Sequence, residues 1–197
     1  MTKTRLEAFS DGVIAIIITI MVLELRPPTG SELGALGALW HDFLAYVLSF
    51  VFIGIYWNNH HHLLHAASRI SGGILWANLH LLFWLSIVPF VTAWMGRTEF
   101  DPVPVAAYGF VLLMDAIAYT ILLRLLIARH GRDSTLARAI GSDVKGWVSL
   151  AIYLVAMPLA LVAPRVAFTL YVIVAAIWLV PDRRIERQLK GGEGYTG

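Results

Sequence analysis

The sequence predicts an all-α, multi-pass membrane protein with six transmembrane helices, and its composition, hydropathy pattern and charge placement each support this fold class. Of its 197 residues, 58% are hydrophobic and only 14% are charged, whereas about a quarter are charged in an ordinary soluble domain. The mean hydropathy is +0.72. A chain of this composition is surrounded mostly by lipid.

Composition also excludes several kinds of site. The chain has no cysteine, which rules out disulfides, zinc-thiolate sites and thiol catalysis. Its formal net charge is +2, too small to suggest nucleic acid as a partner. The lipid bilayer is therefore the first partner that we expect.

Six apolar stretches account for the predicted spans: residues 6–25, 36–58, 73–95, 103–127, 147–163 and 166–180. Most are close to the ~20 residues with which a helix crosses ~30 Å of hydrocarbon. The last two are short. Because Pro158 and Pro164 lie near their junction, they form either a tight helical hairpin or two undersized spans. The first stretch is not expected to be a cleaved signal, because Glu7 and Asp11 interrupt it.

Basic residues fall in alternate connections, which predicts the orientation of the chain. One side holds twelve of the fifteen: Lys3, Arg5, Arg69, Arg124, Arg129, Arg132, Arg138, Lys145, Arg183, Arg184, Arg187 and Lys190. The other side holds only Arg26, Arg97 and Arg165. The positive-inside rule then places both termini in the cytoplasm, which requires an even number of spans. We expect residues 1–190 to form a single six-span domain, with residues 191–197 as a disordered tail.

The first helix has two possible starting points. If Ser10 or Asp11 were its N-cap, about fifteen residues would remain before Arg26, or roughly 22 Å of helix. A start near Arg5 gives about 31 Å and places Ser10, Asp11 and Gly12 well inside the helix. A carboxylate within the membrane needs a partner or water, so Asp11 is a candidate functional residue.

The same helix is predicted to have two different faces. At about 100° per residue, one face carries Phe9, Gly12, Ile16, Thr19, Ile20 and Leu23. Asp11 points about 140° away from Ile16, toward neighbouring helices. Periodicity alone leaves open whether the apolar face lines a pore or meets lipid, and the Thr19 hydroxyl could simply bond back to the Ala15 carbonyl.

Three motifs carry a resemblance to a known family. Arg5-x-x-x-Phe9-Ser10-Asp11-Gly12 resembles the RxxxFSDG motif of the lysosomal potassium channel family and its prokaryotic relatives. The segments Trp57-x-x-His60-His61, Asn78-Leu79 and Pro89-Phe90-x-Thr92 are also similar to that family's pattern. The second half of the chain matches by hydropathy and not by motif.

The resemblance implies a potassium channel in the cell membrane, built as a homotetramer of six-span chains around one pore. The first helix would line the pore, with Ile16 as its narrowest ring, Ile20 and Leu23 as further candidates, and Thr19 as a hydroxyl layer. No TVGYG filter is present. Selectivity would come from a hydrophobic constriction, where the less strongly hydrated ion loses its water more easily. Potassium would be a permeant ion, with no cofactor.

The resemblance further implies a structural network that braces the first helix. Its expected members are Arg5, Phe9, Ser10, Asp11, Gly12, His60 or His61, and Asn78. Arg5 and Asp11 are expected to belong to this structural network and not to the permeation path.

Other polar residues allow alternative interpretations. The run His60-His61-His62-x-x-His65 has metal-like spacing, but only His80 lies elsewhere in a membrane segment, so we expect imidazoles at a helix end and no metal site. Asp115 lies mid-membrane and could pair, titrate or face water. Tryptophans near span ends, such as Trp57, are expected to be interfacial anchors.

The leading hypothesis is thus a channel and not an enzyme, because one histidine cluster without a soluble domain does not support membrane catalysis. The alternative is a proton- or ion-coupled secondary transporter that uses Asp11, Asp115 and the histidines as a relay. The uninterrupted aliphatic face of the first helix favours a pore.

Overall fold

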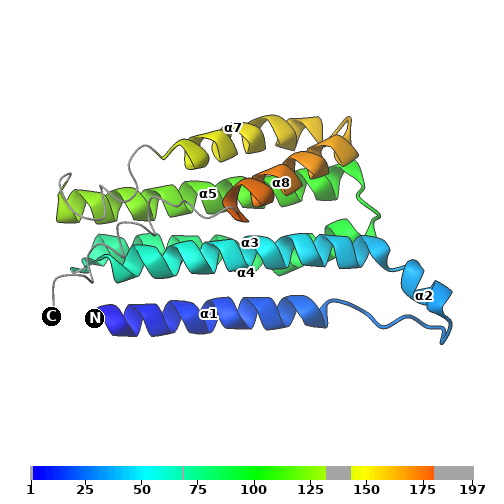
Figure 1. The fold of residues 1–197 in the computed structure, drawn as a ribbon, viewed down its shortest axis with the longest axis horizontal. Coiled ribbons are helices and arrows are strands. Elements are labelled where there is room, and N and C mark those ends of the chain that lie inside the picture. The colour runs from blue at the N-terminus through cyan, green and yellow to red at the C-terminus, as the bar shows by residue number, and fades with distance from the viewer. Residues whose placement is uncertain (1, 68, 132–142, 180–197) are drawn as a thin grey trace, which may run out of the picture.

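A computed structural model describes residues 2–67, 69–131 and 143–179. Every regular element in these ranges is a helix, which confirms the all-α prediction (Figure 1). The helices are α1 (Lys3–Leu23), α2 (Leu33–Gly37), α3 (Trp40–His65), α4 (Gly72–Arg97), α5 (Pro102–His130), α7 (Val144–Leu159) and α8 (Pro164–Leu179). The predicted tail, residues 191–197, lies outside the described residues.

Four of the described helices, α1, α3, α4 and α5, are long and apolar enough to cross a membrane. α7 and α8 have 16 residues each, or ~24 Å of helix, which is shorter than ~30 Å of hydrocarbon. A tight turn joins them, in which the Ala163 amide donates to the Leu159 carbonyl at 2.8 Å. Pro164 opens α8, a position where its missing N–H costs no helical hydrogen bond.

The predicted boundaries of the second span were wrong at both ends. Residues 33–37 form the separate short helix α2, and α3 begins only at Trp40. α3 then continues past residue 58 to His65. The helix persists through the histidine run because Leu63 and Leu64 are buried in the core, so this polar-looking segment has an inward apolar face.

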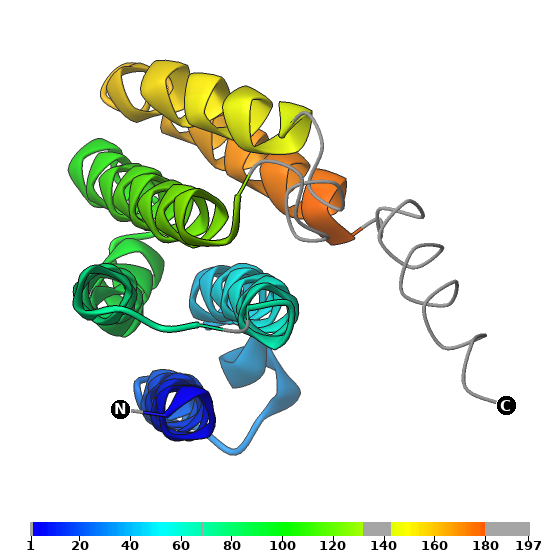
Figure 2. The same cartoon turned by 90° about the vertical axis from the view of Figure 1, so that its left-hand side faces the viewer.

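The helices are arranged in layers, with α1 at one edge of the molecule (Figure 2). α1 packs against α3 and α4, and α4 packs extensively against α5. α7 and α8 lie beyond α5 on the side away from α1, and α8 also reaches α3. One face of α1 is therefore left without a partner from the described part of its own chain.

Polar contacts at both ends fix the axial position of α1. At the start of the helix, Lys3 Nζ donates to the His65 carbonyl at 2.7 Å. At the end, Arg97 forms an ion pair with Glu24 at 2.7 Å and also donates to the Glu24 carbonyl at 3.3 Å. α1 is thus tied to the end of α3 at one surface and to the end of α4 at the other.

A glycine allows α5 and α8 to approach closely. A Cβ added to Gly109 would overlap the Tyr171 hydroxyl, and this hydroxyl donates to the Val105 carbonyl at 3.3 Å. The aromatic-glycine sequence at Tyr108 and Gly109 therefore serves helix packing within this bundle.

Candidate functional site

α1 begins at Lys3, so Ser10 and Asp11 lie more than one turn inside it. The alternative in which either residue caps the helix is excluded. The helix has 21 residues, about 31 Å at 1.5 Å per residue, which is enough to span the hydrocarbon of a bilayer.

The two faces of α1 differ sharply in burial. Leu6, Ser10, Ile14, Ile17 and Met21 are buried against the bundle. The opposite side is exposed and includes Phe9, Gly12, Ile16, Thr19, Ile20 and Leu23. Ile14 is 1% exposed, whereas Ile16 is 58% and Leu23 is 78% exposed. All six residues that helical periodicity grouped in the sequence are therefore exposed, together with Thr4, Arg5, Ala8, Ala15 and Val22.

Thr19 carries the one hydroxyl among the six residues that periodicity grouped. It donates to the Ile16 carbonyl at 2.9 Å, one residue later than the Ala15 carbonyl considered from the sequence. With its proton used inside the helix, the hydroxyl oxygen keeps lone pairs that can accept from, or coordinate, a group outside the helix.

A buried polar network attaches the other face of α1 to α3 and α4. Asn78 donates through Nδ2 to Ser10 Oγ at 2.9 Å, and Ser10 donates to the Leu6 carbonyl at 2.9 Å. His60 Nε2 lies 2.6 Å from Asn78 Oδ1, and because that oxygen only accepts, Nε2 is assigned as the donor. Ser10, His60 and Asn78 are all fully buried. Hydrogen bonds across membrane helices hold their relative rotation.

Asp11 uses a different partner on α3. Trp57 donates through Nε1 to Asp11 Oδ1 at 3.0 Å, and the Trp57 ring stacks on His61 with centroids 6.3 Å apart. The sequence interpretation assigned Trp57 only to interfacial anchoring and missed this bond. The sequence feature that could have indicated this bond is that an indole N–H and an intramembrane carboxylate were both expected near the same end of the bundle.

The remaining predicted network residues lie on the exposed side. Phe9 and Gly12 share the exposed face with Ile16. Within the described residues, no hydrogen bond or ion pair joins Arg5 to Asp11, His60 or His61. The structure thus brings together Ser10, His60 and Asn78 as one group and Asp11 with Trp57 and His61 as another.

The histidine run serves packing and stacking in the described structure. His61 stacks on His65 with ring centroids 6.1 Å apart, while His60 faces the opposite way into the network with Asn78. In the part of the chain that the structure describes, no group of three or more histidine, aspartate or glutamate residues could hold a metal ion.

A second buried polar group, which the sequence analysis missed, links α3, α4 and α5. Ser49 Oγ lies 2.7 Å from Thr92 Oγ1 and 2.9 Å from the Tyr108 hydroxyl. Thr92 also donates to the Val88 carbonyl at 2.7 Å. The sequence feature that could have indicated this group is the presence of isolated hydroxyl residues inside three apolar spans.

Asp115 lies apart from both groups, on α5. It is fully buried, and among the described residues no donor lies within hydrogen-bonding distance of either carboxylate oxygen. Of the options considered from the sequence, pairing with another described side chain is therefore excluded.

Comparison with known proteins supplies the family. A family model described as the endosomal/lysosomal potassium channel TMEM175 matches residues 5–89. This segment contains most of α1, all of α3 and the hydrogen bonds that attach Ser10 and Asp11 to neighbouring helices. The human endosomal/lysosomal proton channel TMEM175 is 39% identical over an alignment of 87 residues that covers 36% of this chain and 17% of the human protein.

Two bacterial relatives match along most of their length. A protein from Chryseobacterium named as a potassium channel is 53% identical over 190 residues, covering 96% of this chain and 99% of the relative. The crystal structure of a lysosomal potassium-selective channel TMEM175 homologue from Chamaesiphon minutus superimposes with a TM-score of 0.79 at 28% identity, covering 90% of this chain and 96% of that one. These relatives are ion channels and not enzymes. The near-complete match to a bacterial relative, the shared fold and the family model together show that the chain belongs to the TMEM175 family of membrane channels.

Proposed function

We propose that this chain is one subunit of a homotetrameric potassium channel in the cell membrane, with six spans, both termini in the cytoplasm and residues 1–190 as one channel domain. The observation that carries the proposal is the exposed apolar face of α1, opposite a face that buried hydrogen bonds fix to α3 and α4. The bacterial relatives, which are named as potassium channels, support potassium as the permeant ion.

A helix that only met lipid would not need a fixed rotation. α1 is held at both ends by Lys3 and Arg97 and in its first half by Asn78. Such attachment fixes the rotation of α1 and therefore determines which side chains point outward. A pore helix requires this, because side chains that form a functional site must be held within ~0.5 Å of the geometry in which they act. Symmetric copies of α1 would then present identical rings toward a central axis.

In this proposal Ile16 forms the narrowest ring. An isoleucine ring offers a permeating ion no ligand to replace its water, so the barrier rises with the cost of dehydration, and sodium should be hindered more than potassium. Thr19 would add a ring of hydroxyl oxygens next to it, and Ile20 and Leu23 would continue the apolar path. Ser10, Asp11, His60 and Asn78 would position the helix without contacting the ion.

The short helices α7 and α8 are proposed as the fifth and sixth spans. The distribution of basic residues requires an even number of crossings if all connections obey the positive-inside rule. Helices of ~24 Å can cross where the bilayer thins or where neighbouring helices cover them. α7 and α8 pack against α5 and against each other, which supplies such cover.

The test is ion flux from purified protein in liposomes, with potassium, sodium and proton gradients each calibrated by an ionophore. Proton flux is included because the human relative is named as a proton channel. We expect passive potassium flux that continues without any co-transported or exchanged ion. Flux that stops when the proton gradient is clamped would favour the coupled transporter instead.

Variants of Ile16 and Thr19 test whether these side chains line the pore. Ile16→Ala should widen the ring and raise sodium permeation relative to potassium, measured as a shift of the reversal potential under bi-ionic conditions. Thr19→Val removes the hydroxyl at nearly constant volume and tests for ligand-based selectivity. The matched control is Ile121→Ala, an exposed isoleucine at 40% on α5, which is separated from α1 by α4 (Figure 2). Unchanged selectivity and conductance in correctly assembled Ile16→Ala would remove Ile16 from the pore.

A further inference from the structure

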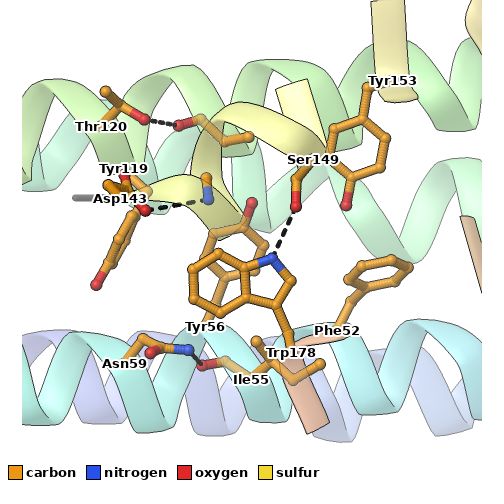
Figure 3. A pocket seen from close by; sticks show the side chains of 12 residues that line it. Phe52, Ile55, Tyr56, Asn59, Tyr119, Thr120, Asp143, Ser149, Tyr153 and Trp178 are labelled. Carbon is orange, nitrogen blue, oxygen red and sulfur yellow. Dashed lines mark hydrogen bonds between the residues drawn. The ribbon is translucent and has the colours of Figure 1, made fainter. Parts of the chain in front are cut away.

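A cavity separate from the α1 face lies between α3, α5, α7 and α8 (Figure 3). Its lining residues are Phe52, Ile55, Tyr56, Asn59, Ala116, Tyr119, Thr120, Asp143, Gly146, Ser149, Tyr153 and Trp178. Its volume is about 40 Å³ over the positions open to the centre of a water molecule. One water needs ~10–15 Å³ by this measure, so the cavity has room for roughly three waters or a small organic ion.

Three of the donors that line this cavity already have acceptors inside the protein. Trp178 Nε1 donates to Ser149 Oγ at 2.8 Å, and Ser149 donates to the Lys145 carbonyl at 2.8 Å. Thr120 donates to the Ala116 carbonyl at 2.8 Å. The hydroxyls of the lining tyrosines have no hydrogen-bond partner among the described residues, and because a hydroxyl can accept as well as donate, they are compatible with a ligand that donates.

The acceptors that line it are largely free. Asn59 donates through Nδ2 to the Ile55 carbonyl at 2.8 Å, and its Oδ1 has no partner among the described residues. Asp143 accepts from the Gly146 amide through Oδ1 at 3.0 Å, which leaves its second oxygen available. A ligand that satisfies Asn59 and Asp143 must itself donate.

The lining also favours positive charge. The described lining contains five aromatic rings, from Phe52, Tyr56, Tyr119, Tyr153 and Trp178, and no described lysine, arginine or histidine. Aromatic faces attract cations, and more strongly where water is excluded. In Figure 3 the hydroxyl ends of Tyr56 and Tyr153 lie on the same side of the cavity as the Ser149 hydroxyl.

Asp115 lies beside the cavity but is not among the residues that line it. It is adjacent in α5 to Ala116 and one turn before Tyr119, both of which line the cavity. Its carboxyl group is fully buried without a hydrogen-bond partner among the described residues. A buried, unpaired carboxyl group carries its charge only where a positive species compensates it and is otherwise protonated, so a cation in the neighbouring cavity would favour the charged form of Asp115.

We propose that this cavity binds a small alkylammonium ion of about the size of methylammonium. Its N–H groups would donate to Asp143 and Asn59, its methyl group would lie against the tyrosine and tryptophan rings, and its charge would offset that of Asp115. The site is separate from the proposed pore, so binding here does not depend on ion conduction along α1.

The test is binding of methylammonium to the purified full chain in micelles, followed by saturation-transfer NMR of its methyl protons. N-methyl-D-glucamine, which is too large for the cavity, keeps the ionic strength constant. We expect a saturable curve. Asp143→Asn removes the charge and retains a residue that caps helices equally well, and it should weaken binding about tenfold or more, because a hydrogen bond to a charged group is lost.

The matched control is Asp101→Asn. Asp101 is an exposed carboxylate at the N-cap of α5, far along that helix from the residues that line the cavity, so this variant should leave the binding curve unchanged. If Asp143→Asn folds poorly, Asp115→Asn and Tyr119→Leu provide further tests of the site, and each should also weaken methylammonium binding. Ile16→Ala should not affect it. A non-saturating curve, or equal binding by wild type and Asp143→Asn, would overturn the proposal. So would displacement by equimolar potassium, which would indicate a site for inorganic cations.

Discussion

Replacing Asn78 by alanine should loosen α1 from the bundle. Asn78 is fully buried and links helices by hydrogen bonds to Ser10 on α1 and His60 on α3. Truncation removes both bonds. Ser10 keeps its bond to the Leu6 carbonyl, but His60 Nε2 is left buried without a described partner.

The expected loss follows from these contacts. Hydrogen bonds between membrane helices contribute about 0.6–2 kcal/mol each. A buried polar group left unsatisfied costs a further ~1–3 kcal/mol. The free energy of unfolding should therefore fall by roughly 2–7 kcal/mol, a large share of the ~5–15 kcal/mol by which native proteins are stable.

The assay is equilibrium unfolding of the purified protein by a denaturing detergent in mixed micelles. Ser86→Ala is the matched control, because Ser86 lies on the exposed side of the same helix and bonds only to the Phe83 carbonyl, within that helix. It should change stability by less than about 0.5 kcal/mol. Combining Ser10→Ala with Asn78→Ala should reveal a coupling energy of about 0.5–3 kcal/mol. Full stability in Asn78→Ala, or strictly additive losses in the double variant, would refute the network.

Three further predictions concern other contacts. Gly109→Ala places a methyl group on the Tyr171 hydroxyl and should cost ~1–3 kcal/mol in the same unfolding assay; Tyr171→Phe should relieve part of this cost, and no relief would contradict the overlap. Trp57→Phe removes the N–H that donates to Asp11 and should lower stability by ~1 kcal/mol while the potassium-to-sodium reversal potential stays constant; a collapse of selectivity would place Asp11 in the permeation path. Elemental analysis should find no stoichiometric transition metal and chelators should leave flux unchanged, whereas about one zinc or iron per chain would restore a metal role for His61.

Hydropathy and periodicity predicted the helical class, the approximate positions of the helices and the exposed face of α1. They succeeded because the extent of an apolar run and the face that a residue occupies on one helix depend on local sequence. The RxxxFSDG resemblance implied a single network in which His60 or His61 joins Arg5 and Asp11. In the described residues, Ser10, His60 and Asn78 are joined by hydrogen bonds, whereas Asp11 bonds to Trp57.

The contacts between distant helices were not predictable in the same way. Hydropathy gives the depth of Trp57 but not the direction of its ring, so its bond to Asp11 was missed. Likewise, nothing local shows that Ser49 faces Tyr108, or that Gly109 makes room for a tyrosine 62 positions later. Such pairs depend on helix rotation and on which helices are neighbours, and both are decided by the packing of the whole bundle.

The attachment of α1 also has a consequence for the order of biogenesis. α1 leaves the ribosome before α3 and α4, but the groups that bond to Ser10 and Asp11 lie on those two helices, and Arg97, which binds Glu24, is the last residue of α4. Until α3 has been inserted, Asp11 lacks the Trp57 N–H, and an unpaired carboxylate within the membrane costs several kcal/mol. α1 therefore reaches its final position only after α3 and α4, although it is made before them.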